Sequence, residues 1–157
     1  METTANSAIT GTLTILANLT FEDRIARGKY DWVNSDITEE HFPTNVTADY
    51  EAEQKLFHFN HLIGSEAAIA EMDKEGFHPA TLAELLVLGE TQPELQKQFP
   101  IIALGSLSRH SGSHRFVPAL RWFGSGRGLN LHWFERDWGD GDRFLAVRKK
   151  KSEPSPA

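Results

Sequence analysis

The residues from 115 to 149 constrain the fold most strongly, because apolar and polar side chains alternate in three short segments there. The segments span residues 116–122, 129–133 and 144–148. Successive side chains of a strand point to opposite faces, so a period of two predicts strands with one face buried. The glycine-rich residues 124–128 predict a flexible hairpin loop between the first two segments. We therefore expect a mostly antiparallel sheet at the end of the domain.

Trp133 and Leu131 occupy one face of the second segment, whereas Asn130 and His132 occupy the other. Large aromatic side chains contribute much of the buried area of a protein. We therefore expect Trp133 and Leu131 to be buried between the sheet and a helix, so that Trp133→Ala lowers stability by about 3–5 kcal/mol. Trp138 lies between charged residues and glycines, and we expect it to be the tryptophan nearest the surface.

The longest stretch with helical spacing covers residues 49–75. The apolar side chains that fall near one face of such a helix are Leu56, Phe59, Ile63 and Ala70. Gly64 interrupts the stretch, and Ser65 is suited to cap a second piece that ends at Gly76. The pattern predicts an amphipathic helix that packs on the sheet.

Shorter helices are indicated by residues that cap a first turn. Capping boxes, in which two side chains bond to each other's backbone, are predicted for Thr20 with Asp23 and for Thr81 with Glu84. Further short helices are expected after Ser35 or Asp36 and after Pro93. Residues 101–104 are a continuous apolar run, which is typical of a central buried strand. Helices followed by a sheet predict an α+β fold in a single domain over residues 1–157, with residues 1–8 and 150–157 disordered.

The charge and the composition exclude several classes of protein. The net charge of −6 argues against nucleic-acid binding, which requires a basic face. The absence of cysteine excludes disulfide bonds, zinc–cysteine sites and thiol catalysis. No apolar run approaches the roughly 20 residues of a membrane span, and the first residues lack the basic and apolar regions of a signal peptide. We expect a cytoplasmic protein that binds neither nucleic acid nor a membrane.

Two stretches of the chain, residues 76–85 and residues 143–148, resemble segments of the C-type-lectin fold. Residues 76–85, with the sequence GFHPATLAEL, are similar to the Gly-aromatic-Arg-Leu-Pro-Thr segment that opens a helix in formylglycine-generating-enzyme-like and lectin-like domains. His78 replaces the arginine, and the proline comes one place early. Residues 143–148, with the sequence RFLAVR, resemble the closing strand of such domains. The resemblance covers residues 76–148 and implies a lectin-like fold with two or more helices packed on the sheet.

Residues 130–142 resemble the variable region of the target proteins of diversity-generating retroelements, a subset of the same fold. Polar and small residues there are interspersed with apolar residues that would belong to the scaffold. The resemblance implies a non-enzymatic module that binds an unknown protein or another ligand. The displayed residues would be Asn130, His132, Glu135, Arg136, Asp137, Trp138, Asp140, Asp142 and Arg143. Two alternatives are open: a calcium-dependent sugar binder or enzyme that uses the aspartates, and a small acidic interaction protein of a phage or mobile element.

Candidate metal and catalytic residues have weak patterns in this chain. The three candidate calcium ligands are Asp137, Asp140 and Asp142. They are not followed by the bidentate glutamate of an EF-hand. The histidine pairs with ligand-like spacing are His110 with His114, in a Gly/Ser-rich loop, and His58 with His61, in the predicted helix. Nothing sets the separation of the carboxylates of Glu135 and Asp137, as a glycosidase requires. We expect no cofactor and no metal, so that calcium, zinc or a chelator leaves the melting temperature unchanged.

Overall fold

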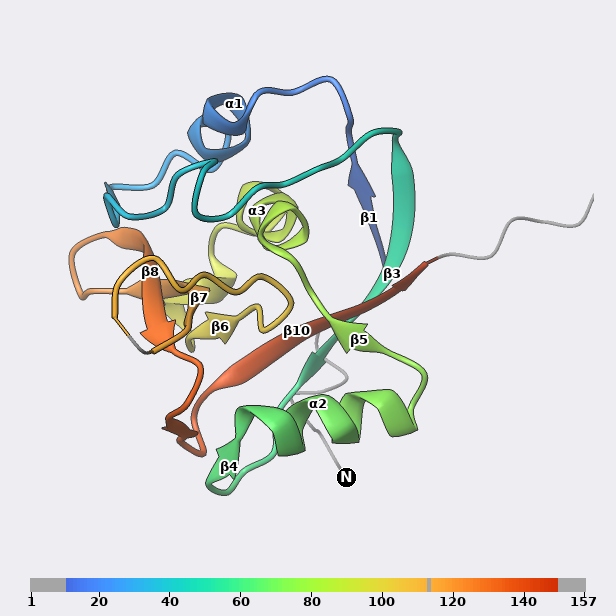
Figure 1. Ribbon diagram of the computed structural model, residues 1–157, viewed down its shortest axis with the longest axis vertical. Coiled ribbons are helices and arrows are strands. Elements are labelled where there is room, and N and C mark those ends of the chain that lie inside the picture. Colours follow the sequence, from blue (N-terminus) through green and yellow to red (C-terminus); the bar gives the residue numbers. More distant parts are fainter. Residues whose placement is uncertain (1–10, 113, 150–157) are drawn as a thin grey trace, which may run out of the picture.

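The structure, a computed structural model, describes residues 11–112 and 114–149, so the disorder predicted at both ends lies outside the described residues. Figure 1 shows the elements of the fold. The strands are β1 (Thr12–Ile15), β2 (Trp32–Val33), β3 (Tyr50–Phe57), β4 (Ile63–Gly64), β5 (His78–Pro79), β6 (Ile101–Ile102), β7 (Phe116–Trp122), β8 (Arg127–Trp133), β9 (Asp137–Trp138) and β10 (Arg143–Lys149). The helices are α1 (Phe21–Ala26), α2 (Ser65–Lys74), α3 (Leu82–Thr91) and the 3-10 helix η2 (Leu95–Lys97).

The main sheet has the strand order β1-β3-β10-β6-β7-β8-β2, and β5 also pairs with β10. The pairs β10–β6 and β2–β8 are parallel, whereas the other pairs are antiparallel. Strands β4 and β9 form a second, two-stranded sheet. The predicted α+β class and the predominance of antiparallel pairing are therefore confirmed, and the three predicted carboxyl-terminal strands are β7, β8 and β10.

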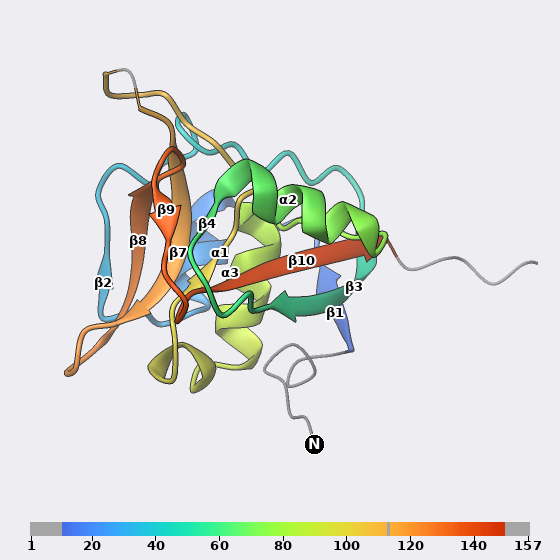
Figure 2. The ribbon, with the colours of Figure 1, turned by 90° about the horizontal axis from the view of Figure 1, so that it is seen from below.

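Helices cover both faces of the main sheet (Figures 1 and 2). On one face, α3 and α1 cover a cluster of buried side chains that includes Leu85, Leu120 and Leu129. On the other face, α2 contributes Met72 to a cluster that includes Phe144. Residues 144–147 of the long strand β10 are buried throughout, because this strand lies in the middle of the sheet between the two layers. The core therefore has two halves, separated by the sheet.

Both predicted capping boxes are present. The Thr20 hydroxyl accepts a hydrogen bond from the backbone N–H of Asp23 at 3.0 Å, and Thr81 and Glu84 form the reciprocal pair at the start of α3. These bonds satisfy backbone donors that a first turn leaves free.

Helices α2 and α3 have ten residues each, and among the described helices none combines the length and the apolar composition of a membrane span.

The long helix predicted for residues 49–75 is wrong over its first half, where the chain forms β3. Ala52, Gln54 and Leu56 are buried at a period of two, and β3 pairs with β1 on one side and with β10 on the other. The residues of β3 favour helices locally, but the hydrogen bonds of two neighbouring strands outweigh this weak preference. The helical piece predicted to begin near Ser65 is present as α2, with Gly64 as its N-cap.

The expected positions of two tryptophans are reversed. Trp138 is 1% exposed, whereas Trp133 is 51% exposed and Leu131 is half-buried. Strand β9 pairs Trp138 with Ile63 of β4, which places the indole in the interior near the start of α2. Trp133 comes at the last position of β8, a strand whose residues change from buried at its start to exposed at its end.

Two of the remaining elements were predicted correctly. Residues 101–102 form β6, a buried strand between β10 and β7, and η2 follows Pro93. The helix predicted after Ser35 or Asp36 is wrong, because the structure has only turns over residues 34–42. The backbone N–H of Ile37 donates to the carbonyl of Asn34, and Ile37 is buried in the core, which anchors this loop without a helix.

Candidate functional site

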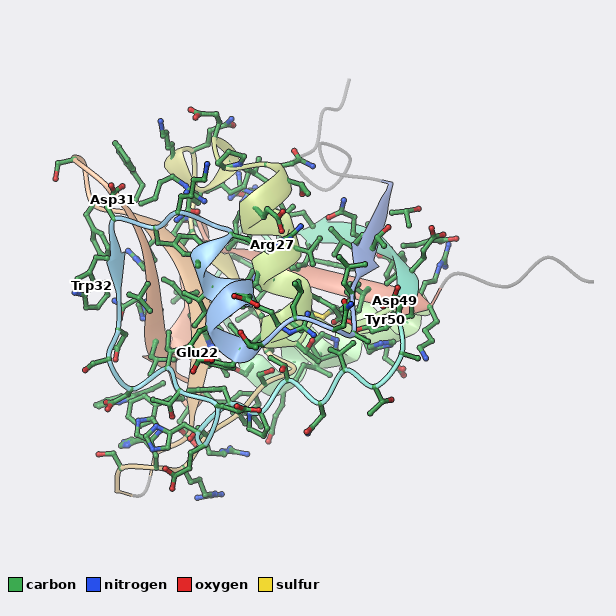
Figure 3. The ribbon with its side chains drawn as sticks, turned by 90° about the horizontal axis from the view of Figure 1, so that it is seen from above. Glu22, Arg27, Asp31, Trp32, Asp49 and Tyr50 are labelled. Carbon is green, nitrogen blue, oxygen red and sulfur yellow. The ribbon has the colours of Figure 1, made fainter. Side chains whose placement is uncertain are left out.

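The last residues of β8 lie at an open edge of the main sheet. Strand β2, on which Trp32 is labelled in Figure 3, pairs with β8 only at Gly128 and Leu129. The last bonds between the two segments join the backbone N–H of Asn34 to the carbonyl of Leu129 at 2.9 Å and the side chains of Asn34 and Asn130 at 3.0 Å. No other described strand lies beside residues 131–133 on that side. The edge of β8 is therefore open from Leu131 onward.

The pairing of β8 determines which backbone groups point out of that edge. Neighbouring residues of a strand direct their N–H and C=O groups to opposite sides. Because the carbonyl of Leu129 points toward β2, the backbone groups of Leu131 and Trp133 point the same way. Pro118 faces Leu131 from β7 and has no N–H to give, which fits this alternation. Among the described residues, only the carbonyl of Trp133 finds a partner at this edge, the N–H of Arg136 at 3.5 Å.

A hollow of about 280 Å³ follows this edge. It is lined by Phe116, Leu131, His132, Trp133 and Arg136. Leu131 and Trp133 lie on one face of β8 and His132 on the other, so a hollow that they share must lie at the edge of the strand. The Trp133 ring stacks on His114 with 4.0 Å between the ring centroids, which holds a large exposed aromatic surface in place.

Two arginines converge on His132 across the other face of β8. Nη1 of Arg121 lies 3.1 Å from Nε2 of His132, and Nη1 of Arg136 lies 3.2 Å from Nδ1. Burial, followed by the charges of the two guanidinium groups, lowers the pKa of His132 to about 4. A neutral imidazole has only one acceptor nitrogen, so it cannot accept from both arginines. One guanidinium therefore faces an N–H group and has a donor to spare.

The two guanidinium groups also lack an anionic partner in the part of the chain that the structure describes. Arg121 and Arg136 form no ion pair with any carboxylate among the described residues. Arg136 instead stacks over the Trp138 ring, with 4.9 Å between its guanidinium carbon and the ring centroid. A local excess of positive charge with free donors is a site for a carboxylate or another anion. It is notable in a chain whose net charge is −6.

His132 makes the stability of the protein depend on pH. Its pKa is about 4 in the folded protein, against an ordinary value of 6.5, so the unfolded chain binds the proton more readily. The contribution to stability is complete above pH 6.5 and is lost as the pH falls toward 4. We expect His132→Gln to reduce the dependence of the free energy of unfolding on pH in this window. The slope of that free energy against pH should change by no more than the contribution of one bound proton. Denaturant unfolding at several pH values measures this slope. The exposed His61, replaced by Gln, is the control, and an unchanged slope in His132→Gln would contradict the assignment.

Only three of the nine predicted display residues meet at the open edge. They are Asn130, His132 and Arg136. Trp138 is buried, which corrects its assignment as a displayed residue. Glu135 accepts hydrogen bonds from the backbone and the guanidinium of Arg115, and the side-chain bond lowers the pKa of this carboxyl. It therefore holds the turn after β8 in place.

The other four predicted residues support the loop between β8 and β10. Asp137 belongs to β9, and the side chain of Asp142 accepts from the backbone N–H of Gly139 at 2.9 Å. The carbonyl of Asp140 contacts the ring of His58, and Arg143 stacks over Phe99. This loop is thus held by contacts to distant segments, while Asp137 and Asp140 are exposed and Asp142 and Arg143 are half-buried.

The candidate metal ligands are arranged differently from the patterns in the sequence. His110 stacks on His41 and His114 stacks on Trp133, so these two histidines have separate partners. His58 and His61 follow β3 in a loop, which corrects their assignment to a helix. The three aspartates do not gather in a group of potential ligands. Among the described residues, the one group of three that does is Asp36 with His41 and His110.

Sequence reasoning missed Arg121, Phe116 and Trp133 as site residues, because strand positions were assigned to the scaffold. A signal was present in the order of the residues, since Arg121 and His132 fall on the same face of two strands joined by a hairpin. Comparisons with protein families, with characterised proteins and with solved structures find no match to this chain. The function must therefore be argued from the site alone.

Proposed function

We propose that this protein is a non-enzymatic binding module that takes up an extended, acidic peptide segment as an additional strand beside β8. The observation that carries the proposal is the open edge at residues 131–133. An exposed hollow with aromatic walls follows this edge, and two arginines without carboxylate partners among the described residues converge on His132 beside it. An exposed sheet edge is a ready template for another extended chain. Binding of this kind obtains affinity from main-chain hydrogen bonds and specificity from alternate side chains.

The geometry assigns a role to each part of the site. The N–H and C=O groups of Leu131 and the N–H of Trp133 would bond to the peptide backbone. Peptide side chains would then alternate between the two faces of the extended sheet. An apolar side chain on one face would lie against Trp133 and Phe116. A carboxylate on the other face would accept hydrogen bonds from Arg121 and Arg136, which are the donors best suited to carboxylates.

We also propose that the scaffold is of the C-type-lectin type. The two stretches that resemble that fold are hydrogen-bonded neighbours, since Pro79 pairs with Ala146 and His78 with Val147. The same stretch then leads through the Thr81 capping box into α3. This arrangement supports a common structural unit made of the helix-opening segment and the closing strand.

A target protein of a diversity-generating retroelement would place its variable residues at such a site. Asn130, His132 and Arg136 lie in the stretch that resembles a variable region, and they also surround the open edge. The prediction for the flanking DNA is a near-repeat of the coding region for residues 129–148, beside a reverse transcriptase gene, with differences only at adenines. A flanking sequence without such a repeat would contradict this part of the proposal and leave the peptide site unaffected.

Selection from a random peptide display library against the full-length protein tests the function. We expect the selected peptides to combine Asp or Glu with apolar or β-branched residues at alternate positions. Arg121→Gln together with Arg136→Gln should weaken the binding of the corresponding synthetic peptides at least tenfold, which corresponds to about 1.4 kcal/mol. Methylation of a backbone nitrogen in the centre of the peptide should weaken binding similarly, because it removes a strand hydrogen bond.

A matched control separates the site from general charge. Arg148→Gln removes an arginine from β10, which is separated from β8 by the two strands β6 and β7, and we expect it to leave peptide binding unchanged. Circular dichroism would verify that each variant is folded. If no peptide is selected, or if the peptides bind the double variant as tightly as the original protein, recognition at this edge is wrong.

A further inference from the structure

Two loops that are distant in the sequence bring three potential metal ligands together. Asp36 and His41 belong to the loop after β2, and His110 belongs to the loop between β6 and β7. Each side chain offers one ligand atom, and the three atoms lie within 4.8 Å of one another. The Asp36 side chain is 57% exposed, whereas that of His110 is 7% exposed, so the group is accessible from the Asp36 side.

The hydrogen bonds of the two imidazoles leave one nitrogen of each ring for a ligand. Nδ1 of His41 lies 2.7 Å from the backbone carbonyl of Asp36. A carbonyl only accepts, so His41 carries its proton on Nδ1 and has a free electron pair on Nε2. Nδ1 of His110 lies 2.8 Å from the Ser108 hydroxyl, which directs Nε2 of His110 toward Asp36. Metal-binding histidines are commonly oriented in this way, by a bond from the second ring nitrogen.

The separation between His110 and Asp36 suits a first-row transition metal. Bonds of about 2.0–2.1 Å at a tetrahedral angle place two ligand atoms roughly 3.3 Å apart. Nε2 of His110 lies 3.5 Å from a carboxylate oxygen of Asp36. The rings of His41 and His110 are stacked, with 4.1 Å between centroids and 12° between planes, so one ring must turn before a nitrogen of each points at the same ion. Phe42 and Phe116 also pack against His110. The frame around the ligands is therefore built largely of aromatic contacts.

Ser108, His110 and Asp36 also resemble a Ser-His-Asp arrangement, because the two ring nitrogens of His110 face the Ser108 hydroxyl and the Asp36 carboxylate. Ser108 is only 8% exposed, however, and its hydroxyl is not accessible as a nucleophile requires. The separation of 3.5 Å between His110 and Asp36 also exceeds that of a strong hydrogen bond to a carboxylate. Ser108 is better placed to orient the ring of His110.

We propose that Asp36, His41 and His110 bind one divalent transition-metal ion of the zinc class. Two histidines and one carboxylate make up a three-ligand set, which leaves a fourth position for water or a ligand group. The ion joins the loop after β2 to the loop before β7. This replaces the expectation from the sequence that zinc leaves the melting temperature unchanged. The proposal does not depend on peptide binding at β8.

Titration of the full-length protein with zinc chloride, after removal of metal with a chelator, tests the site. Calorimetry should show one zinc per chain, and zinc should raise the melting temperature because it binds the native state. Asp36→Asn and His41→Gln should each weaken zinc binding at least tenfold. His114→Gln, a change at a histidine outside the group, should leave it unchanged. Cobalt(II) used in place of zinc should give a visible absorption spectrum that is lost in the same two variants.

The outcomes are distinct even when a variant folds poorly. Asp36 is exposed, so Asp36→Asn should keep the fold, as circular dichroism would show. If His41→Gln does not fold, zinc binding by Asp36→Asn alone tests the site. Calcium serves as the ion control, because it prefers six to eight oxygen ligands and should not shift the melting temperature. The proposal is overturned if zinc does not bind in the micromolar range. It is also overturned if folded Asp36→Asn binds zinc as tightly as the original protein.

Discussion

Trp138→Ala is expected to lower the free energy of unfolding by about 3–5 kcal/mol, the range observed when a large buried side chain is truncated. Trp138 is 1% exposed and packs edge-on against Phe144, with 5.7 Å between the ring centroids. Its Nε1 donates to the Ser65 hydroxyl at 2.8 Å, and that hydroxyl donates to the carbonyl of Phe134 at 2.6 Å. Truncation therefore opens a cavity and also removes the donor from a buried chain of hydrogen bonds.

Guanidinium denaturation followed by circular dichroism measures the loss. Trp138→Phe retains most of the ring but not the N–H, so it should cost less than Trp138→Ala. Trp133→Ala is the matched control, because Trp133 is 51% exposed and surface substitutions usually change stability by about 0.5 kcal/mol. If Trp133→Ala proved the more costly of the two alanine variants, the burial assigned to these tryptophans would be wrong.

Arg127→Met is expected to lower the free energy of unfolding by a similar amount, about 3–5 kcal/mol, because it leaves several buried acceptors without a donor. Arg127 is 8% exposed although it lies next to a hairpin turn. Its guanidinium donates to the carbonyl of Gly28 at 2.6 Å, to the carbonyl of Gly89 at 2.9 Å and to the side chain of Gln96 at 3.1 Å. It thereby joins the ends of α1 and α3 to the beginning of β8.

Methionine has a similar length but cannot donate, so the variant tests the hydrogen bonds and retains much of the packing. Thermal and denaturant unfolding would measure the change. The stability of Arg127→Lys should fall between that of the original protein and that of Arg127→Met, because an ammonium group does not reproduce the planar fork of a guanidinium. The exposed Arg109, replaced by Met, is the control and should change stability by about 0.5 kcal/mol or less. A loss of less than 1 kcal/mol in Arg127→Met would show that the buried carbonyls find other donors.

The surroundings of Tyr30 show how a local reading of glycine can miss a tertiary role. Gly28 follows the end of α1, and Gly89 lies within α3. A Cβ atom at Gly89 would lie 2.0 Å from the Tyr30 hydroxyl, and one at Gly28 would lie 2.3 Å from the ring. Both glycines are therefore required by the approach of Tyr30, which also stacks on the buried Arg127.

The proposed peptide and metal sites show a similar division. His132 and Arg136 were identified from a polar stretch, but Arg121 joins them only because β7 and β8 are paired in a particular register. The proposed metal ligands Asp36, His41 and His110 have no recognisable spacing, since His110 lies in a loop that is distant from the other two in the sequence. The pair His110 and His114, which is close in the sequence, contains one of these residues, but His114 stacks on a tryptophan instead.

Local patterns determined the elements whose signals are local. The capping boxes at Thr20 and Thr81 and the alternation in β7, β8 and β10 depend on neighbouring residues, and these elements form as predicted. Tertiary structure alone decided that residues 50–57 form a strand, because β1 and β10 supply the hydrogen bonds on both sides. It also decided that Trp138 is buried and Trp133 exposed, since burial depends on which distant segments cover a side chain. The physical reason is that covering segments and strand partners come from remote parts of the chain, and their positions leave no mark in the local sequence.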